Sequence, residues 1–117
     1  MEHIFNFPEF IKKPGQPELF ETLCGGSGKF KVERIVSWGH VTAAGEWYDQ
    51  ENDEWAMVLE GEAVIGFSDG TETRLRRGES IVLPRFRRHR VLYTSRPCIW
   101  LAVHAAVLEP AEQESGS

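Results

Sequence analysis

Hydrophobic and polar residues alternate in short runs over most of the chain, and turn residues separate these runs. Residues 30–37 begin with strict alternation, which is the pattern of a β-strand with one face buried. Similar short runs follow at residues 54–59, 62–67, 71–75, 80–83, 89–93 and 98–107. The turn signals between them are Gly61, Asp69-Gly70, Gly78 and Pro84. Many short strands at near-regular spacing predict an all-β sandwich or barrel.

The two ends of the chain depart from this pattern. Residues 17–24 start with a proline, carry acidic residues early and are followed by two glycines. These signals predict a short helix with Leu19, Phe20 and Leu23 on its apolar side. An alternative is an arm that packs on the barrel or on a partner subunit. The polar C-terminal tail is predicted to be disordered. The expected organisation is an arm at 1–29, a barrel at 30–108 and a tail at 109–117.

The composition is that of one globular domain. The chain has 117 residues, 41% hydrophobic and 26% charged, and this length suits a single core. Its formal net charge of -5 argues against non-specific nucleic-acid binding, for which a basic domain is expected. No apolar run approaches about 18 residues, so no membrane span is expected. The first residues lack the features of a signal peptide, and Cys24 and Cys98 form no disulfide pattern. We therefore expect a cytoplasmic protein.

Two segments supply a carboxylate and an imidazole. In the first, Glu54 opens a strand-like run that closes at Gly61. In the second, Gly78 is followed by Pro84 and then by His89. Glu54 and His89 therefore lie on two strands that are bounded by turn residues, and a small β-barrel can gather metal ligands from such distant positions.

These segments resemble the two short motifs of the cupin superfamily, and the resemblance covers residues 30–107. The first motif of that family carries two histidines. Their places fall here on Tyr48 and Gln50, or on Trp47 and Asp49 with the longer spacing. Runs similar to those of small single-domain bacterial cupins stand at residues 47–50, 53–55, 89–91 and 99–104.

The resemblance implies a jelly-roll barrel (a double-stranded β-helix) that holds a divalent metal on its inner face and a substrate in its mouth. Of the family's four metal ligands, Glu54 and His89 match in type. Gln50 through its amide oxygen, or Asp49 through its carboxylate, would complete a facial triad. Such a set suits Fe, Mn, Zn or Ni as the cofactor.

Each candidate also has a simpler interpretation. Glu54 could be a solvated residue at the edge of its strand, and His89 could be a hydrogen-bonded structural residue. His104 and His40 could join a pocket or pack in the core or at its rim. The aromatic candidates for pocket walls are Trp47, Tyr48, Trp55 and Tyr93.

A cluster of arginines surrounds His89 and continues in the preceding hairpin. Guanidinium groups at the rim of a barrel would bind a carboxylate or phosphate ligand through bidentate contacts. The simpler interpretation is a solvated edge that discourages pairing with other strands. The arginines concerned are Arg74, Arg76, Arg77, Arg85, Arg87, Arg88 and Arg90.

The sequence leaves three functions open. The favoured expectation is a barrel that binds a small molecule, with or without a divalent metal. The alternatives are a metal-dependent oxygenase or isomerase acting on a small organic substrate, and a metal-free structural or oligomerisation barrel. A homodimer is expected by analogy, and because four tryptophans and an apolar N-terminal arm need cover.

Overall fold

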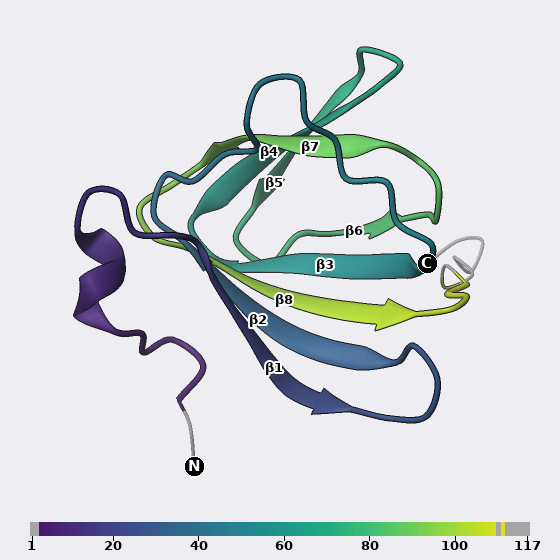
Figure 1. Ribbon diagram of the computed structural model, residues 1–117, viewed down its shortest axis with the longest axis horizontal. Coiled ribbons are helices and arrows are strands. Elements are labelled where there is room, and N and C mark those ends of the chain that lie inside the picture. The colour runs from purple at the N-terminus through teal and green to yellow at the C-terminus, as the bar shows by residue number, and fades with distance from the viewer. Residues whose placement is uncertain (1–2, 110, 112–117) are drawn as a thin grey trace, which may run out of the picture.

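The computed structural model describes residues 3–109 and residue 111, and within them the chain forms one short helix and eight strands (Figure 1). Apart from Glu109 and Ala111, the tail predicted to be disordered lies outside the described residues. No helix in this part of the chain is long and apolar enough to cross a membrane. The elements are the 3-10 helix η1 (Glu9–Lys12) and the strands β1 (Leu19–Gly25), β2 (Lys31–Ser37), β3 (Asp53–Glu60), β4 (Glu62–Phe67), β5 (Glu72–Arg76), β6 (Ser80–Leu83), β7 (His89–Thr94) and β8 (Cys98–Ala105).

The strands form two antiparallel sheets that face each other. The larger sheet has the order β1-β2-β8-β3-β6, and the smaller sheet has the order β5-β4-β7. In Figure 1 the two sheets approach each other on the side near η1 and diverge toward the opposite side. This two-sheet barrel confirms the predicted all-β jelly-roll fold.

The hydrophobic core fills the space between the two sheets. Alternation along each strand sends every second side chain inward, and the inward side chains of both sheets pack together. Val58 and Cys98 are fully buried, and Trp100 is 5% exposed. The other members of this cluster are Ala56, Ala63, Ile65, Phe67, Leu75 and Leu83. Burial of each large side chain contributes roughly 1.5–3 kcal/mol, so this cluster holds the two sheets together.

Residues 17–24 do not form the predicted helix, and that prediction was wrong. Most of the segment belongs to β1, which pairs with β2 along its whole length. Pairing sets Leu19 opposite Val36 and Phe20 opposite Ile35, so apolar side chains reach both faces of the sheet. A helix of one or two turns is marginal by itself, and pairing with a neighbouring strand outweighs its weak local preference. As a result, the larger sheet begins within the predicted arm.

The rest of the N-terminal arm packs on the outer face of the larger sheet. Ile11 is buried there against Val36 and Ile99. Arg34, a buried residue of β2, holds the preceding residues through its Nη1 atom. This atom donates to the backbone carbonyl oxygens of His3, Ile4 and Asn6. The residues before β1 therefore cover one end of the outer face of the larger sheet.

Candidate functional site

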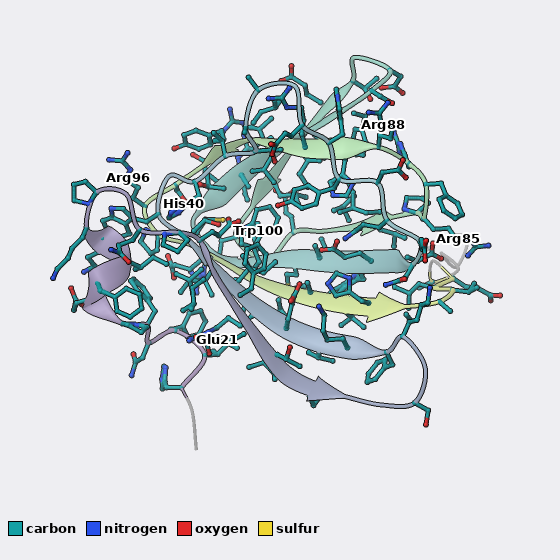
Figure 2. The ribbon with its side chains drawn as sticks, viewed as in Figure 1. Glu21, His40, Arg85, Arg88, Arg96 and Trp100 are labelled. Atoms are coloured by element: carbon teal, nitrogen blue, oxygen red, sulfur yellow. The ribbon has the colours of Figure 1, made fainter. Side chains whose placement is uncertain are left out.

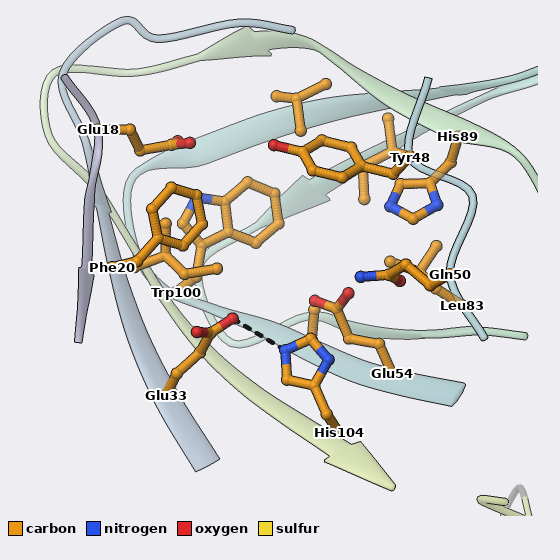
Figure 3. Close-up of a pocket in the computed structure, with 14 residues that line it drawn as sticks. Glu18, Phe20, Glu33, Tyr48, Gln50, Glu54, Leu83, His89, Trp100 and His104 are labelled. Carbon is orange, nitrogen blue, oxygen red and sulfur yellow. Dashed lines mark hydrogen bonds and ion pairs between the residues drawn. The ribbon is translucent and has the colours of Figure 1, made fainter. Parts of the chain in front are cut away.

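A cavity between the two sheets collects several buried polar side chains (Figure 3). Its volume is about 80 Å³, which is room for a few water molecules or a small organic ligand. The aromatic side chains on its walls are Phe20, Tyr48 and Trp100. Its polar groups are Glu18, Glu33, Gln50, Glu54, His89 and His104.

Strand pairing brings Glu54 and His104 side by side. The two residues are direct partners on β3 and β8, and Glu54 is also the partner of Leu83 on β6. Side chains of directly opposed residues project from the same face of a sheet, so all three reach the cavity. Glu33 reaches it from β2, which flanks β8 on the other side. The larger sheet thus supplies an acidic wall.

Glu33 and His104 form a buried pair. The Nε2 atom of His104 lies 2.9 Å from Oε1 of Glu33, and the Nζ atom of Lys31 lies 3.3 Å from its Oε2. Burial alone would raise the pKa of Glu33, but the hydrogen bonds and charges of His104 and Lys31 together lower it below its usual value. Glu33 is therefore ionised at neutral pH, and these two partners compensate its charge.

Glu54 is buried without an ion pair. It is 7% exposed, and within the described residues the nearby side chains of Lys31 and His104 pair with Glu33 instead. Burial raises the pKa of Glu54, and the charge of His104 and a hydrogen bond from the Gln50 amide offset this effect only in part. Glu54 therefore keeps its proton to a higher pH than an ordinary glutamate.

Replacing Glu54 with glutamine is expected to stabilise the protein at neutral pH but not at acidic pH. The folded-state pKa of Glu54 lies above the ordinary value of 4.5. As the pH rises from that value through the folded pKa, the unfolded chain loses this proton first, so the free energy of unfolding falls. Glutamine has no such proton, so the free energy of unfolding of Glu54→Gln does not fall in this pH range. Urea denaturation at about pH 4 and about pH 8 measures the difference between the two proteins.

Glu60→Gln is the matched control, since Glu60 is an exposed residue at the end of the same strand. This variant should stay within about 0.5 kcal/mol of the wild type at both pH values. If Glu54→Gln showed no gain over the wild type at the higher pH, the carboxyl group of Glu54 would not be buried and unpaired.

His89 is held in place by its contact with Tyr48. The backbone N–H of Tyr48 donates to the carbonyl of His89 at 2.7 Å, the reverse bond measures 3.1 Å, and the two rings stack with centroids 5.3 Å apart. His89 is 5% exposed, and burial lowers its pKa, so the ring is neutral at physiological pH. Its Nδ1 atom lies 3.4 Å from the Arg87 carbonyl, while Nε2 makes no hydrogen bond to any described residue. With the ring proton on Nδ1, Nε2 is left as an acceptor for a ligand.

Glu18 enters the cavity just before β1. The hydroxyl of Ser37 donates to its carboxylate, and the indole N–H of Trp100 donates to that hydroxyl at 3.3 Å. Burial raises the pKa of Glu18 by more than the hydrogen bond from Ser37 and the charge of His40 lower it. The cavity therefore contains a second carboxyl group with a raised pKa, fixed next to the indole ring.

The segment at 47–50 contributes only alternate residues to the cavity. Tyr48 and Gln50 line it. Their neighbours point the other way, as alternation in an extended segment requires. Asp49 is exposed, and the ring of Trp47 contacts the guanidinium groups of arginines outside the cavity. Neither Asp49 nor Trp47 lies where the sequence analysis placed it.

Tyr93 also lies outside the cavity. On β7, Val91 is the partner of Ile65 but Tyr93 is the partner of Val64, so one extra residue stands between them. Such a bulge shifts the alternation of side chains. As a result, Val91 lines the cavity and Tyr93 is 44% exposed on the outer surface.

His40 and Trp55, the remaining candidates, face other surroundings. Both ring nitrogens of His40 contact backbone groups, one in its own turn and one in the N-terminal arm. Its Nδ1 atom accepts from the backbone N–H of Trp38 at 2.8 Å, and its Nε2 atom lies 2.6 Å from the Gln16 carbonyl. Trp55 follows the inward Glu54, so it lies on the outer face of the larger sheet.

The arginine cluster does not reach the cavity. Figure 2 shows Arg85 and Arg88 at the outside of the barrel, away from Trp100. Arg85 lies 3.5 Å from the carboxylate of Asp53, and Arg87 lies 3.8 Å from the centroid of the Phe67 ring. Among the described residues, no arginine or lysine side chain lines the cavity. The cluster therefore fits the solvated edge and not an anion clamp at this site.

The described residues do not fit the predicted metal centre. Among them, no three His, Cys, Asp or Glu side chains are arranged to share a metal ion. Glu54 and His89 line the same cavity, but the third place of a facial triad falls to the amide of Gln50, since Asp49 points away. A complete ligand set for Fe, Mn, Zn or Ni is thus missing from this part of the chain.

The fold and the cavity define a class of small double-sheet β-barrels with a polar interior. A family model for the cupin domain matches residues 39–104, which is more than half of the chain. The chain therefore belongs to the cupin superfamily, as its two motifs predicted.

Solved structures show the same fold. A protein from Ralstonia eutropha JMP134, provisionally assigned as a mannose-6-phosphate isomerase, is 34% identical, with a TM-score of 0.80 over 92% of this chain and 98% of that chain. A cupin superfamily protein from Desulfitobacterium hafniense DCB-2 is 18% identical, with a TM-score of 0.65 over 78% of each chain. A DMSP lyase from Ruegeria pomeroyi DSS-3 is 20% identical, with a TM-score of 0.64 over 80% of this chain and 49% of that chain. The last two likenesses concern the fold alone. No curated protein matches the chain.

Proposed function

We propose that this cupin binds a small organic molecule in the cavity between its sheets. The observation that carries the proposal is the burial of Glu54 and His89, which are 7% and 5% exposed and face one cavity without an ion pair among the described residues. Among the described residues the Glu54 carboxyl has no charge partner and the Nε2 atom of His89 makes no hydrogen bond, and selection for stability alone would replace such groups by apolar ones. A ligand that interacts with both Glu54 and His89 would explain why these polar side chains occur in the cavity.

The composition of the cavity wall supports this proposal. Ligand sites are mostly apolar and aromatic, with a few placed polar groups that orient the ligand. Trp100, Ile35 and Val91 supply apolar surface here, while Glu54 and His89 supply polar atoms. The sugar phosphate named for the Ralstonia relative is not carried over, because the described residues place no arginine or lysine side chain at this cavity to neutralise a phosphate.

Filling the cavity mouth is expected to abolish ligand binding without unfolding the barrel. Gln50 lies in an irregular segment. Its side-chain amide donates to Glu54, and its backbone carbonyl accepts from the N–H of Phe86 at 2.8 Å. Gln50→Trp keeps the backbone bond and places a large ring in the cavity. Saturation-transfer NMR with a library of small fragments should show hits for the wild type that lose at least about 90% of their signal with Gln50→Trp.

Asp49→Trp is the matched control, because the neighbouring side chain is exposed and lies outside the cavity. It should retain the fragment hits. Hits that persist in Gln50→Trp, or a library without any hit, would favour the metal-free structural barrel instead.

A metal-dependent oxygenase or isomerase remains the alternative function. Its support is that Glu54, His89 and Gln50 line one cavity, and that the Ralstonia relative carries an isomerase assignment. The incomplete set of donors weighs against it. Elemental analysis of protein purified without a histidine tag or chelator decides between the two: one bound divalent metal per chain would favour the alternative.

We further propose that the chain forms a homodimer through the outer face of its larger sheet. The N-terminal arm covers one end of this face, and half-buried apolar side chains continue beyond it. Apolar side chains on this face can pack against the same side chains of a second copy related by a two-fold axis. The residues concerned are Val32, Trp55, Met57, Val82, Leu101 and Val103. Sedimentation equilibrium should give twice the 13.3 kDa chain mass, and a mass of one chain would exclude the dimer.

We also propose that the protein is located in the cytoplasm. Cys24 is exposed and Cys98 is buried, and both are free thiols. A reducing compartment keeps thiols in this state. Cell fractionation that recovers the protein outside the cytoplasm would contradict the proposal.

A further inference from the structure

We infer that the ligand of this cavity is a small organic cation of the primary ammonium class and not an anion. The inference rests on the proposed function, because it names the ligand chemistry of the same cavity. Charge, hydrogen-bonding polarity and aromatic walls each support it.

The cavity carries an excess of carboxyl groups. Glu18, Glu33 and Glu54 line it, whereas the described arginine and lysine side chains do not. His104 and Lys31 compensate Glu33, but Glu18 and Glu54 form no ion pair within the described residues. A bound cation would supply the missing charge, and an anion would meet repulsion in a poorly solvated space.

The carboxyl groups of the cavity also act on the phenol group of Tyr48. Burial raises the pKa of Tyr48, and the charges of Glu18, Glu54 and Glu33 raise it further. A negative charge on Tyr48 is thus disfavoured by the same carboxyl groups that would attract a cation. The ring stays neutral and available as a wall.

The free polar atoms of the cavity are mainly acceptors. Carboxylate oxygens accept hydrogen bonds, and the Nε2 atom of His89 is left as an acceptor when its other nitrogen faces the Arg87 carbonyl. A primary ammonium group has three N–H donors and no acceptor. Glu54 and His89 are both more than nine-tenths buried and line the cavity together, so each offers an acceptor to an ammonium group bound there.

Aromatic rings complete a site for a cation with an alkyl chain. Trp100, Tyr48 and Phe20 line the cavity, and a cation is attracted to the face of such rings, most strongly to that of tryptophan. Ile35 and Val91 offer apolar surface for the hydrocarbon part.

A bound cation would supply the charge partner that Glu54 lacks within the described residues. The groups that face Glu54 from the surrounding elements are Glu18, Lys31, Glu33, Tyr48, His89 and His104. Lys31 and His104 are already paired with Glu33, so the ammonium group is the cation that completes Glu54. With this partner in place, the buried carboxylate would no longer be uncompensated.

The test uses three probes of similar size: n-propylammonium, 1-propanol and propionate. Each is titrated into the 15N-labelled full chain at neutral pH while two-dimensional NMR spectra are recorded. We expect n-propylammonium to shift the Trp100 indole signal and to bind at least about tenfold more tightly than 1-propanol, with no binding of propionate. In Glu54→Gln the affinity for n-propylammonium should fall to within about threefold of that for 1-propanol, whereas Glu60→Gln should behave as the wild type.

The outcomes separate this inference from the proposed function. If 1-propanol or propionate binds in the cavity as tightly as n-propylammonium, the cavity is a ligand site but the cation class is overturned. If Glu54→Gln keeps the preference for the ammonium probe, the assigned role of Glu54 is overturned. If none of the three probes shifts a cavity signal, the cation inference fails, and the fragment screen with Gln50→Trp then tests the proposed function by itself.

Discussion

Truncation of Trp100 to alanine is expected to lower the free energy of unfolding by about 3–5 kcal/mol. The indole is 5% exposed, lies in the main core cluster and donates to Ser37 at 3.3 Å. Its loss leaves a void between the two sheets that the surrounding strands cannot close fully. Thermal unfolding followed by circular dichroism should show a Tm lower by more than about 10 °C.

Trp100→Phe separates packing from the hydrogen bond. It keeps most of the apolar surface but leaves the Ser37 hydroxyl without its indole donor, so we expect a loss of no more than about 2 kcal/mol. A change below about 1 kcal/mol for Trp100→Ala would mean that the indole does not fill the space between the sheets.

Gly61→Ala is expected to destabilise the barrel by at least about 3 kcal/mol, through backbone strain and a steric clash. Gly61 has a φ of 83° in the turn between β3 and β4, a conformation that only glycine adopts without strain. A Cβ atom at this position would collide with the Ser95 hydroxyl and the Pro97 carbonyl oxygen. One of these is backbone, so the neighbouring turn would have to move. Urea denaturation monitored by tryptophan fluorescence measures the loss.

Gly78→Ala isolates the contribution of strain. Gly78 has a φ of 84°, but a Cβ atom added there meets no other atom within 4 Å. This variant should lose only about 1–2 kcal/mol. Equal losses for Gly61→Ala and Gly78→Ala would show that the clash with Ser95 and Pro97 is relieved in solution.

The all-β class of the fold could be predicted because it depends on local signals, whereas the jelly-roll arrangement and the choice of Glu54 and His89 came from the resemblance to cupins. Turn glycines and prolines define where strands end, and the spacing from Gly78 to His89 places an imidazole on an inward position of β7. Glu54 heads a strand whose turn at Gly61 is fixed by backbone geometry. Turn residues and motif spacings lie in short stretches of sequence, so they can be recognised without knowing which strands pair.

The rest of the site depends on strand pairing, which local patterns do not reveal. Local signals predict a helix for the segment with Glu18 and Phe20, because the β2 edge with which this segment pairs lies elsewhere in the sequence. Glu33 stands in a run with apolar residues on both faces, so its inward direction is decided by the register with β8. Tyr93 was assigned to the inner face, but one extra residue on β7 reverses the alternation before it.

An isolated signal for Glu33 was nevertheless present. A carboxylate that alternates with Lys31 and Ile35 on one face of a strand is unusual for a buried position, and it needs a partner. His104 on the neighbouring strand provides one at 2.9 Å. An acidic residue on one predicted strand and a histidine on another therefore indicate a candidate buried acid–imidazole pair.

The most direct test of the account is a crystal structure of the full chain with the tightest fragment from the screen. We expect ligand density between the sheets, in contact with Trp100, and a polar group of the ligand within hydrogen-bond distance of Glu54 or of Nε2 of His89. Ligand density only on the outer surface, with the cavity closed by its own side chains, would contradict the claim that this cavity is the functional site.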